Sequence, residues 1–168
     1  MNKNKNKNLI NEIITAAESL NINDLFDACA WLREDGVMLF DEETGTDFMV
    51  IPQMSELYKC DPDGELTPYD SLECLLLGVM DAIKNHCRSY EDKWFDGSTA
   101  GMFFDNYKFW KERFDEDDKA GKDHPGYDQL KIFALHETLA DWLRFDMQTL
   151  YEEEKQKNKR SELKLVKN

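Results

Sequence analysis

Apolar residues recur at helical spacing along most of this chain, and the clearest departure from that pattern lies between Gly36 and Pro52. There, two short apolar runs, Val37 to Phe40 and Phe48 to Ile51, flank an acidic segment that contains Gly45. Such a pattern is typical of a β-hairpin whose glycine occupies a turn position with positive φ. The chain is therefore expected to be a mostly helical α+β protein with one small antiparallel sheet.

A third strand is expected around Leu57 to Lys59, because the sequence that follows it, Asp61-Pro62-Asp63-Gly64, has a favoured turn residue at each position. The three strands would form an antiparallel meander between Val37 and Cys60. About five helices would pack against this sheet to close a single core.

The helices are predicted from their start signals and apolar stripes. Asn23 is a good N-cap for an early helix, with Asp24 in its first turn, and Thr67 followed by Pro68 is a strong start for the central helix. One unbroken stripe then marks that central helix: Leu72, Leu75, Leu76, Val79, Met80 and Ile83. Later helices are expected from about Ser98 to Asp117 and from near Tyr127 through Leu150.

Charge divides the chain into three parts. The whole sequence has 21 Lys and Arg against 35 Asp and Glu, a net charge of −14. Basic residues concentrate at the ends, so residues 1–8 are expected to be a flexible basic tail and residues 155–168 a frayed basic tail. Residues 9–154, the expected single globular domain, retain 12 basic against 34 acidic side chains, a net of −22.

An acidic body of this kind repels nucleic acid and anionic membranes and attracts basic protein surfaces. Its longest apolar run, Leu75 to Met80, is far shorter than a membrane span, and the basic N-terminus leads into a polar amphipathic segment rather than a signal sequence. The four cysteines include no CxxC pair, which favours reduced, structural thiols. We therefore expect a cytoplasmic protein that binds neither membranes nor, through its body, nucleic acid.

Two acidic clusters are the candidate partner-binding sites. One belongs to the hairpin turn, which must be solvated and can project toward a partner. The other closes the predicted helix that ends near Asp117. Neither cluster has the alternating ligands and central glycine of a calcium loop. Their members are Asp41, Glu42, Glu43, Asp47, Asp115, Glu116, Asp117 and Asp118.

The most enzyme-like residues do not form a convincing active site. Adjacent His136 and Glu137 point about 100° apart on a helix, whereas Asp141 shares a face with Glu137 and is predicted to pair with Arg144. Asn85-His86-Cys87 contains a base and a nucleophile, but neighbours on a helix do not face each other. The sequence therefore predicts no catalytic residues, no metal site and no cofactor.

The order of features from Val37 to Arg88 resembles the ArdB/KlcA antirestriction family. The features are VMLF, EETG, Asp47-Phe-Met-Val-Ile-Pro52, LYK, DPDG and a helix that leads to His86-Cys87-Arg88; farther on, Tyr127-Asp-Gln-Leu-Lys-Ile-Phe-Ala-Leu is similar to a helix motif of that family. The resemblance implies a phage- or plasmid-type protein that blocks restriction of incoming DNA without being an enzyme.

The leading hypothesis is an acidic, non-catalytic inhibitor of a basic nucleic-acid-processing enzyme or complex, of the antirestriction or a related antidefence kind. An immunity protein against a nuclease toxin is an alternative, because such proteins are also small and acidic. A small helical metal-dependent hydrolase that uses Glu137, Asp141 and acids of the central helix is the alternative from another class. An interaction module without an inhibitory role also fits the sequence.

Overall fold

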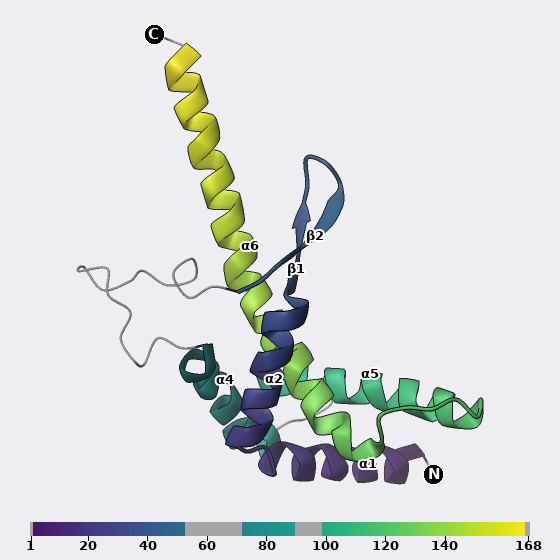
Figure 1. Cartoon of the computed structure of the whole chain (residues 1–168). Helices are drawn as coiled ribbons and strands as arrows, with labels where there is room; N and C mark the ends of the chain where they lie inside the picture. Colours follow the sequence, from purple (N-terminus) through teal and green to yellow (C-terminus); the bar gives the residue numbers. More distant parts are fainter. Residues whose placement is uncertain (1, 53–71, 90–98, 167–168) are drawn as a thin grey trace.

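The computed structural model describes residues 2–52, 72–89 and 99–166 (Figure 1). Helices dominate these residues, and one two-stranded antiparallel sheet accompanies them. The predicted α+β class with a mostly helical composition is confirmed in this form. The third strand expected around Leu57 to Lys59 and the helix start at Thr67 lie outside the described residues.

Two helices, α1 (Asn2–Glu18) and α2 (Ile22–Asp35), precede the sheet. The N-cap of α2 is Asn21, not Asn23 as expected. The Asn21 side chain accepts the backbone N–H groups of Asn23 at 2.9 Å and Asp24 at 3.1 Å. The Asp24 carboxylate in turn accepts the N–H of Asn21 at 3.0 Å, which completes a capping box. Asp24 contributes to the helix start by this contact back to the cap.

The hairpin consists of β1 (Val37–Asp41) and β2 (Thr46–Val50), as predicted, with Val37 opposite Val50 and Asp41 opposite Thr46. Gly36 separates α2 from β1 at a φ of +74°, and a Cβ there would lie 2.8 Å from the carbonyl oxygen of Val50. Only glycine tolerates both conditions. Gly45 has a φ of +67°, which confirms its predicted place in the turn.

The rest of the described chain is helical: α4 (Leu72–His86), the short 3-10 helix η1 (Cys87–Ser89), α5 (Thr99–Lys119), the 3-10 helix η3 (Tyr127–Gln129) and α6 (Leu130–Val166). The predicted stripe of α4 is buried, apart from the half-buried Leu75. Together these helices enclose one hydrophobic core, whose fully buried large side chains include Ile13, Leu25, Leu76, Phe103, Leu135 and Leu139.

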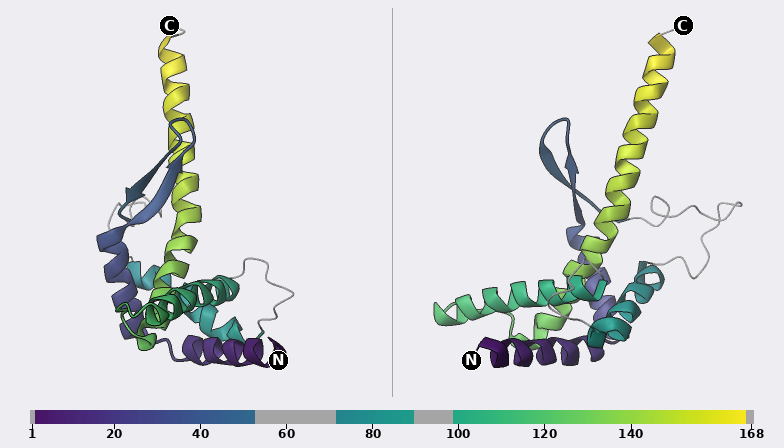
Figure 2. Two further views of the ribbon diagram at one scale, coloured as in Figure 1. Left: turned by 90° about the vertical axis from the view of Figure 1, so that its right-hand side faces the viewer. Right: turned by 180° about the vertical axis from the view of Figure 1, so that it is seen from behind.

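The longest element, α6, has 37 residues and is therefore roughly 55 Å long. Its first half packs in the core, and its second half extends beyond the other helices with the hairpin beside it (Figures 1 and 2). The segments expected to be tails are helical where the structure describes them. Residues 2–8 belong to α1, where neither glycine nor proline interrupts the helix, and the segment that begins at residue 155 continues α6 to Val166.

Candidate partner-binding surface on the hairpin

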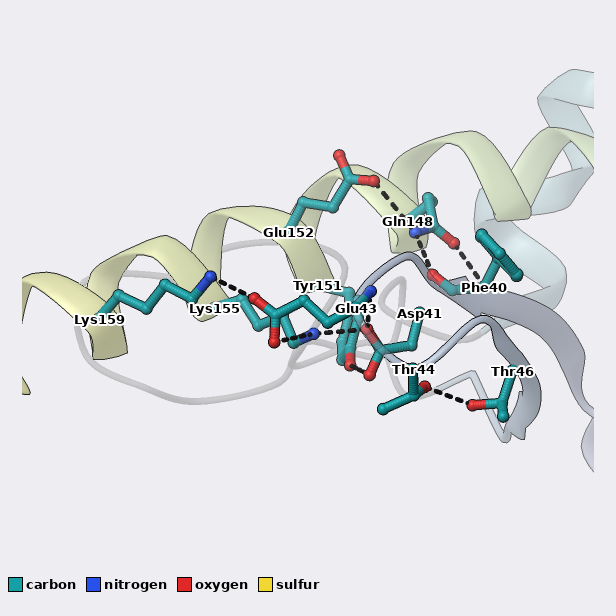
Figure 3. A network of polar contacts seen from close by, with 10 residues as sticks. All are labelled: Phe40, Asp41, Glu43, Thr44, Thr46, Gln148, Tyr151, Glu152, Lys155 and Lys159. Atoms are coloured by element: carbon teal, nitrogen blue, oxygen red, sulfur yellow. Dashed lines mark hydrogen bonds and ion pairs between the residues drawn. The ribbon is translucent and has the colours of Figure 1, made fainter.

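The hairpin is attached to α6 along the edge of β1 that does not pair with β2. Gln148 forms two hydrogen bonds with the backbone of Phe40. Its Oε1 accepts from the Phe40 N–H at 3.0 Å, and its Nε2 donates to the Phe40 carbonyl at 2.8 Å (Figure 3). One turn earlier on α6, Arg144 Nε donates to the carbonyl of Met38 at 3.0 Å. Among the described residues no further strand pairs with this edge of β1, and side chains of α6 bond its backbone instead.

Toward the turn, the attachment is ionic. Lys155 Nζ lies 2.5 Å from Asp41 Oδ1 and 3.3 Å from Glu43 Oε2, and Lys159 also pairs with Glu43 (Figure 3). The Tyr151 hydroxyl donates to the second carboxylate oxygen of Asp41 at 3.2 Å. Tyr151, Lys155 and Lys159 are spaced four residues apart, so they lie along one face of α6. This face of the helix receives two of the four hairpin acids.

These contacts shift the titration of the groups involved. The pKa of Asp41 is lowered, chiefly by the hydrogen bond from Lys155, and the pKa of Glu43 is lowered, chiefly by the hydrogen bond from Lys159. The same hydrogen bond with Asp41 is the main reason that the pKa of Lys155 is raised. Both carboxylates are accordingly held in the ionised form that the lysines require.

The other two predicted hairpin acids are in a different situation. Glu42 and Asp47 are exposed, and neither side chain forms an ion pair or a hydrogen bond with any residue in the described part of the chain. The structure therefore divides the four acids by partner: Asp41 and Glu43 are neutralised by α6, while Glu42 and Asp47 present unbalanced charge to solvent.

A groove lies on the inner side of the hairpin, between it and α6, with a volume of about 460 Å³. Leu39 and Val50 line it from the hairpin, and Met147 and Leu150 line it from the helix, where Glu153, Glu154 and Lys157 add charge. Near it, the rings of Phe48 and Tyr151 are in contact, with centroids 4.9 Å apart. The inner face of the hairpin is thus apolar at its base and acidic at its tip.

The second predicted cluster, Asp115 to Asp118, lies at the C-terminal end of α5, away from the hairpin (Figures 1 and 2). The Tyr127 hydroxyl donates to Asp115 at 2.7 Å, and this hydrogen bond is the main reason that the pKa of Tyr127 is raised to about 12. Asp118 lies 3.6 Å from His124. The side chains of Glu116 and Asp117 have no such partner among the described residues, so the two predicted clusters form two separate surfaces.

His136, Glu137 and Asp141, the most enzyme-like residues of α6, lie among packing and hydrogen-bonding contacts of the fold. The His136 ring packs edge-on against Trp31 at 5.7 Å between centroids, and burial lowers its pKa. Asp141 binds Arg144 at 2.9 Å, as predicted, and also accepts from Asn106 of α5 at 3.3 Å. Burial raises the pKa of Glu137, with a further contribution from Asp141. In the described ranges, no three His, Cys, Asp or Glu side chains lie close enough to hold a metal ion.

Of the three cysteines in the described residues, two fit the structural role expected of them, whereas the third, Cys74, is exposed. Cys29 and Cys87 are buried free thiols. Burial raises the pKa of Cys29 to about 12 and is also the main cause of the raised pKa of Cys87. A thiol with a raised pKa is a poor nucleophile at neutral pH. His86 is exposed, whereas the neighbouring Cys87 is buried.

Comparison of the chain with protein-family models, with curated proteins and with solved structures finds no match. Within residues 2–52, 72–89 and 99–166, no helix is both long and apolar enough to cross a membrane.

The sequence did not lead us to expect the contacts of Lys155 and Lys159 with the hairpin. The available signal was their spacing with Tyr151 on one helical face.

Proposed function

We propose that this protein is a non-catalytic acidic inhibitor that binds a basic nucleic-acid-processing enzyme or complex, of the antirestriction or a related antidefence kind. The observation that carries the proposal is the pair of exposed acids, Glu42 and Asp47, on a hairpin anchored to α6. The anchored backbone holds these charges in a defined position. A partner that supplies Lys or Arg side chains would find carboxylates that α6 has not already neutralised.

The overall charge supports the same function. Residues 9–154 carry a net charge of −22, which raises the rate of encounter with a basic protein and opposes direct contact with DNA. The resemblance of the segment from Val37 to Arg88 to the ArdB/KlcA family adds the class of partner, a DNA-restriction complex. The phage- or plasmid-type origin and the cytoplasmic location belong to this proposal as well.

The first experiment measures restriction in bacteria that express the chain. Unmodified phage is plated on a host with an active restriction complex, and expression is expected to raise the plating efficiency, because inhibition of the complex leaves more of the incoming DNA uncut. A chain that rescues cells from a nuclease toxin but leaves phage restriction unchanged would instead be an immunity protein, which contradicts the antirestriction proposal.

The second experiment locates the binding charge with matched variants. Glu42→Gln/Asp47→Asn and Asp41→Asn/Glu43→Gln each remove two charges from the same hairpin. The first is expected to slow association with the purified restriction complex by about 3- to 10-fold in low salt, and less at high salt. The second should slow it less, because lysines of α6 already oppose those charges. Equal effects would contradict the role of Glu42 and Asp47.

Glu116→Gln/Asp117→Asn is the control at the other acidic surface. It removes the same charge from the C-terminal end of α5 and is expected to leave association near the wild-type rate. A larger effect here than at the hairpin would move the binding surface to α5.

The non-catalytic part of the proposal is tested by metal analysis of the purified protein. Stoichiometric zinc or manganese would favour the hydrolase instead.

A further inference from the structure

The hairpin has a second apolar face, and of its apolar side chains only Phe40 lines a hollow shared with α6. Side chains alternate along a strand, so Val37 and Leu39 point to the buried side, while Met38, Phe40 and Met49 point to the other. These three side chains are 41%, 44% and 50% exposed, and Ile51, just past β2, is 44% exposed. A solvent-facing side of an antiparallel sheet normally carries polar residues. Four large apolar side chains together indicate an interaction surface.

This outer face is held in a fixed shape. The two hydrogen bonds from Gln148 anchor the backbone of Phe40, and the one from Arg144 anchors that of Met38. Ordering a flexible hairpin on binding would cost free energy, and a hairpin already fixed to a helix avoids most of that cost. The exposed side chains are therefore already in position, and the hairpin does not need to become ordered when a partner binds.

The inner face indicates which chemistry such a hairpin binds. There, the apolar base of the hairpin lies by Met147 and Leu150 of α6, and the acidic tip pairs with Lys155 and Lys159 farther along the same helix. A hairpin of this kind therefore accommodates a helix in which an apolar turn is followed, one to two turns farther along, by basic side chains. The molecule carries one such helix itself.

The outer face repeats this order of side chains. Met38 and Met49 face each other across the strands near the base, and Phe40 follows opposite Asp47. Glu42 lies beyond, at the turn. The apolar part is thus succeeded by two carboxylates without a partner among the described residues. Charge complementarity favours a basic occupant, whereas a second copy of this chain would bring a further net charge of −14.

We propose that the outer face of the hairpin docks an amphipathic basic helix of the partner protein. Its apolar side chains would cover Met38, Phe40, Met49 and Ile51, and its Lys or Arg side chains, one to two turns farther along, would pair with Asp47 and Glu42. This inference rests on the proposed function, because it specifies how the basic partner is recognised.

The test uses the full chain labelled with ¹³C at the methionine methyl groups, and a synthetic helical peptide that carries a leucine stripe followed by lysines at i and i+4. On titration, the methyl signals of Met38 and Met49 are expected to shift. The signals of Met147, in the inner groove, and of Met80, in the core, should stay in place. Peptides with Glu for Lys, or with Gln for Leu, are expected to bind at least about 10-fold more weakly.

A matched pair of uncharged substitutions sharpens the test. Met38→Thr/Met49→Thr keeps strand-favouring residues and is expected to weaken peptide binding about 10-fold. Phe26→Gln removes a side chain that is equally exposed, at 49%, on α2 and should change binding less than about 2-fold. Wild-type affinity in the methionine variant, or shifts at Met147 instead of Met38 and Met49, would overturn the docking site.

Two other occupants would also be recognised. A wild-type dimer in sedimentation that the methionine variant abolishes would assign the face to a second copy. A fall of about 10 °C or more in the melting temperature of that variant would show that the methionines support the chain's own fold, and would likewise overturn the proposal. Failure of the docking site is distinct from failure of the proposed function, since the methionine variant would then still protect phage DNA from restriction.

Discussion

The two halves of α6 are held in place by different forces. From Leu130 to Met147 the helix buries an apolar face in the core, with Leu135 and Leu139 fully shielded from solvent. Beyond Met147, Leu150 and Tyr151 are only partly buried, and the polar partners that the helix has on other elements are the hairpin backbone and the hairpin acids. Apolar burial is strong and insensitive to salt, whereas exposed ion pairs are weak and screened. One continuous helix thus consists of an anchored segment and a segment whose position depends on the hairpin.

This difference bears on binding. The second half of α6 neutralises the two acids that it pairs with, so Glu42 and Asp47, which form no ion pair among the described residues, retain unbalanced charge. If the comparison is right, substitutions in the first half should affect the whole fold, and substitutions in the second half should affect the hairpin alone.

The largest effect is expected for Leu135→Ala. This fully buried side chain contributes both transfer free energy and packing, so its truncation should lower the free energy of unfolding by about 2 to 5 kcal/mol in chemical denaturation. Leu150→Ala makes the same chemical change in the second half, where the side chain is half-buried, and should cost clearly less. Equal costs would contradict the division of α6.

Gln148→Ala should have the next largest effect. It removes both hydrogen bonds to Phe40 and should cost about 1 kcal/mol, since the exposed backbone groups recover water as a partner. Amide hydrogen exchange at Phe40 should become faster. Gln148→Glu is the control, because a carboxylate retains the acceptor for the Phe40 N–H and loses the donor to its carbonyl. Unchanged exchange at Phe40 in Gln148→Ala would show that β1 is held in another way.

Acidification should release the tip before it affects the core. Because the native pKa values of Asp41 and Glu43 are lowered, their pairing stabilises the native state above their ordinary values of 3.8 and 4.5, and this contribution is lost as the pH falls through the lowered values. Backbone amide shifts of residues 41–44 should therefore move only below these ordinary values, while that of the buried Leu76 in α4 moves less. Titration of both carboxylates at their ordinary values would contradict the pairing.

The smallest effect is expected for Lys155→Gln/Lys159→Gln. Its ion pairs are exposed, so the melting temperature should hardly change, while amide exchange near Glu43 becomes faster. Added salt should produce the same local change in the wild type. Lys157→Gln, which removes a lysine that has no ion pair within the described residues, is the control. A large fall in melting temperature in the double variant would mean that the second half contributes to the core.

The sequence by itself determined the elements that depend on neighbouring residues. The apolar stripe of α4, the turn at Gly45 and the Asp141–Arg144 pair were all predicted, because helix period, positive φ and i,i+3 spacing are local properties. The cap of α2 was misassigned by the same local reasoning, since Asn21 and Asn23 are both suitable cap residues. The structure distinguishes them by the contact from Asp24 back to Asn21.

Only the tertiary structure decided which hairpin acids have partners. Asp41 and Lys155 are 114 positions apart, and Glu43 and Lys159 are 116 apart. Their meeting depends on the direction in which α6 leaves the core and on the docking of β1 against it. The sequence alone does not distinguish the four hairpin acids, Asp41, Glu42, Glu43 and Asp47, by whether they have a partner. The fold separates them because a strand turns neighbouring side chains to opposite faces, and only Asp41 and Glu43 meet the lysines of α6.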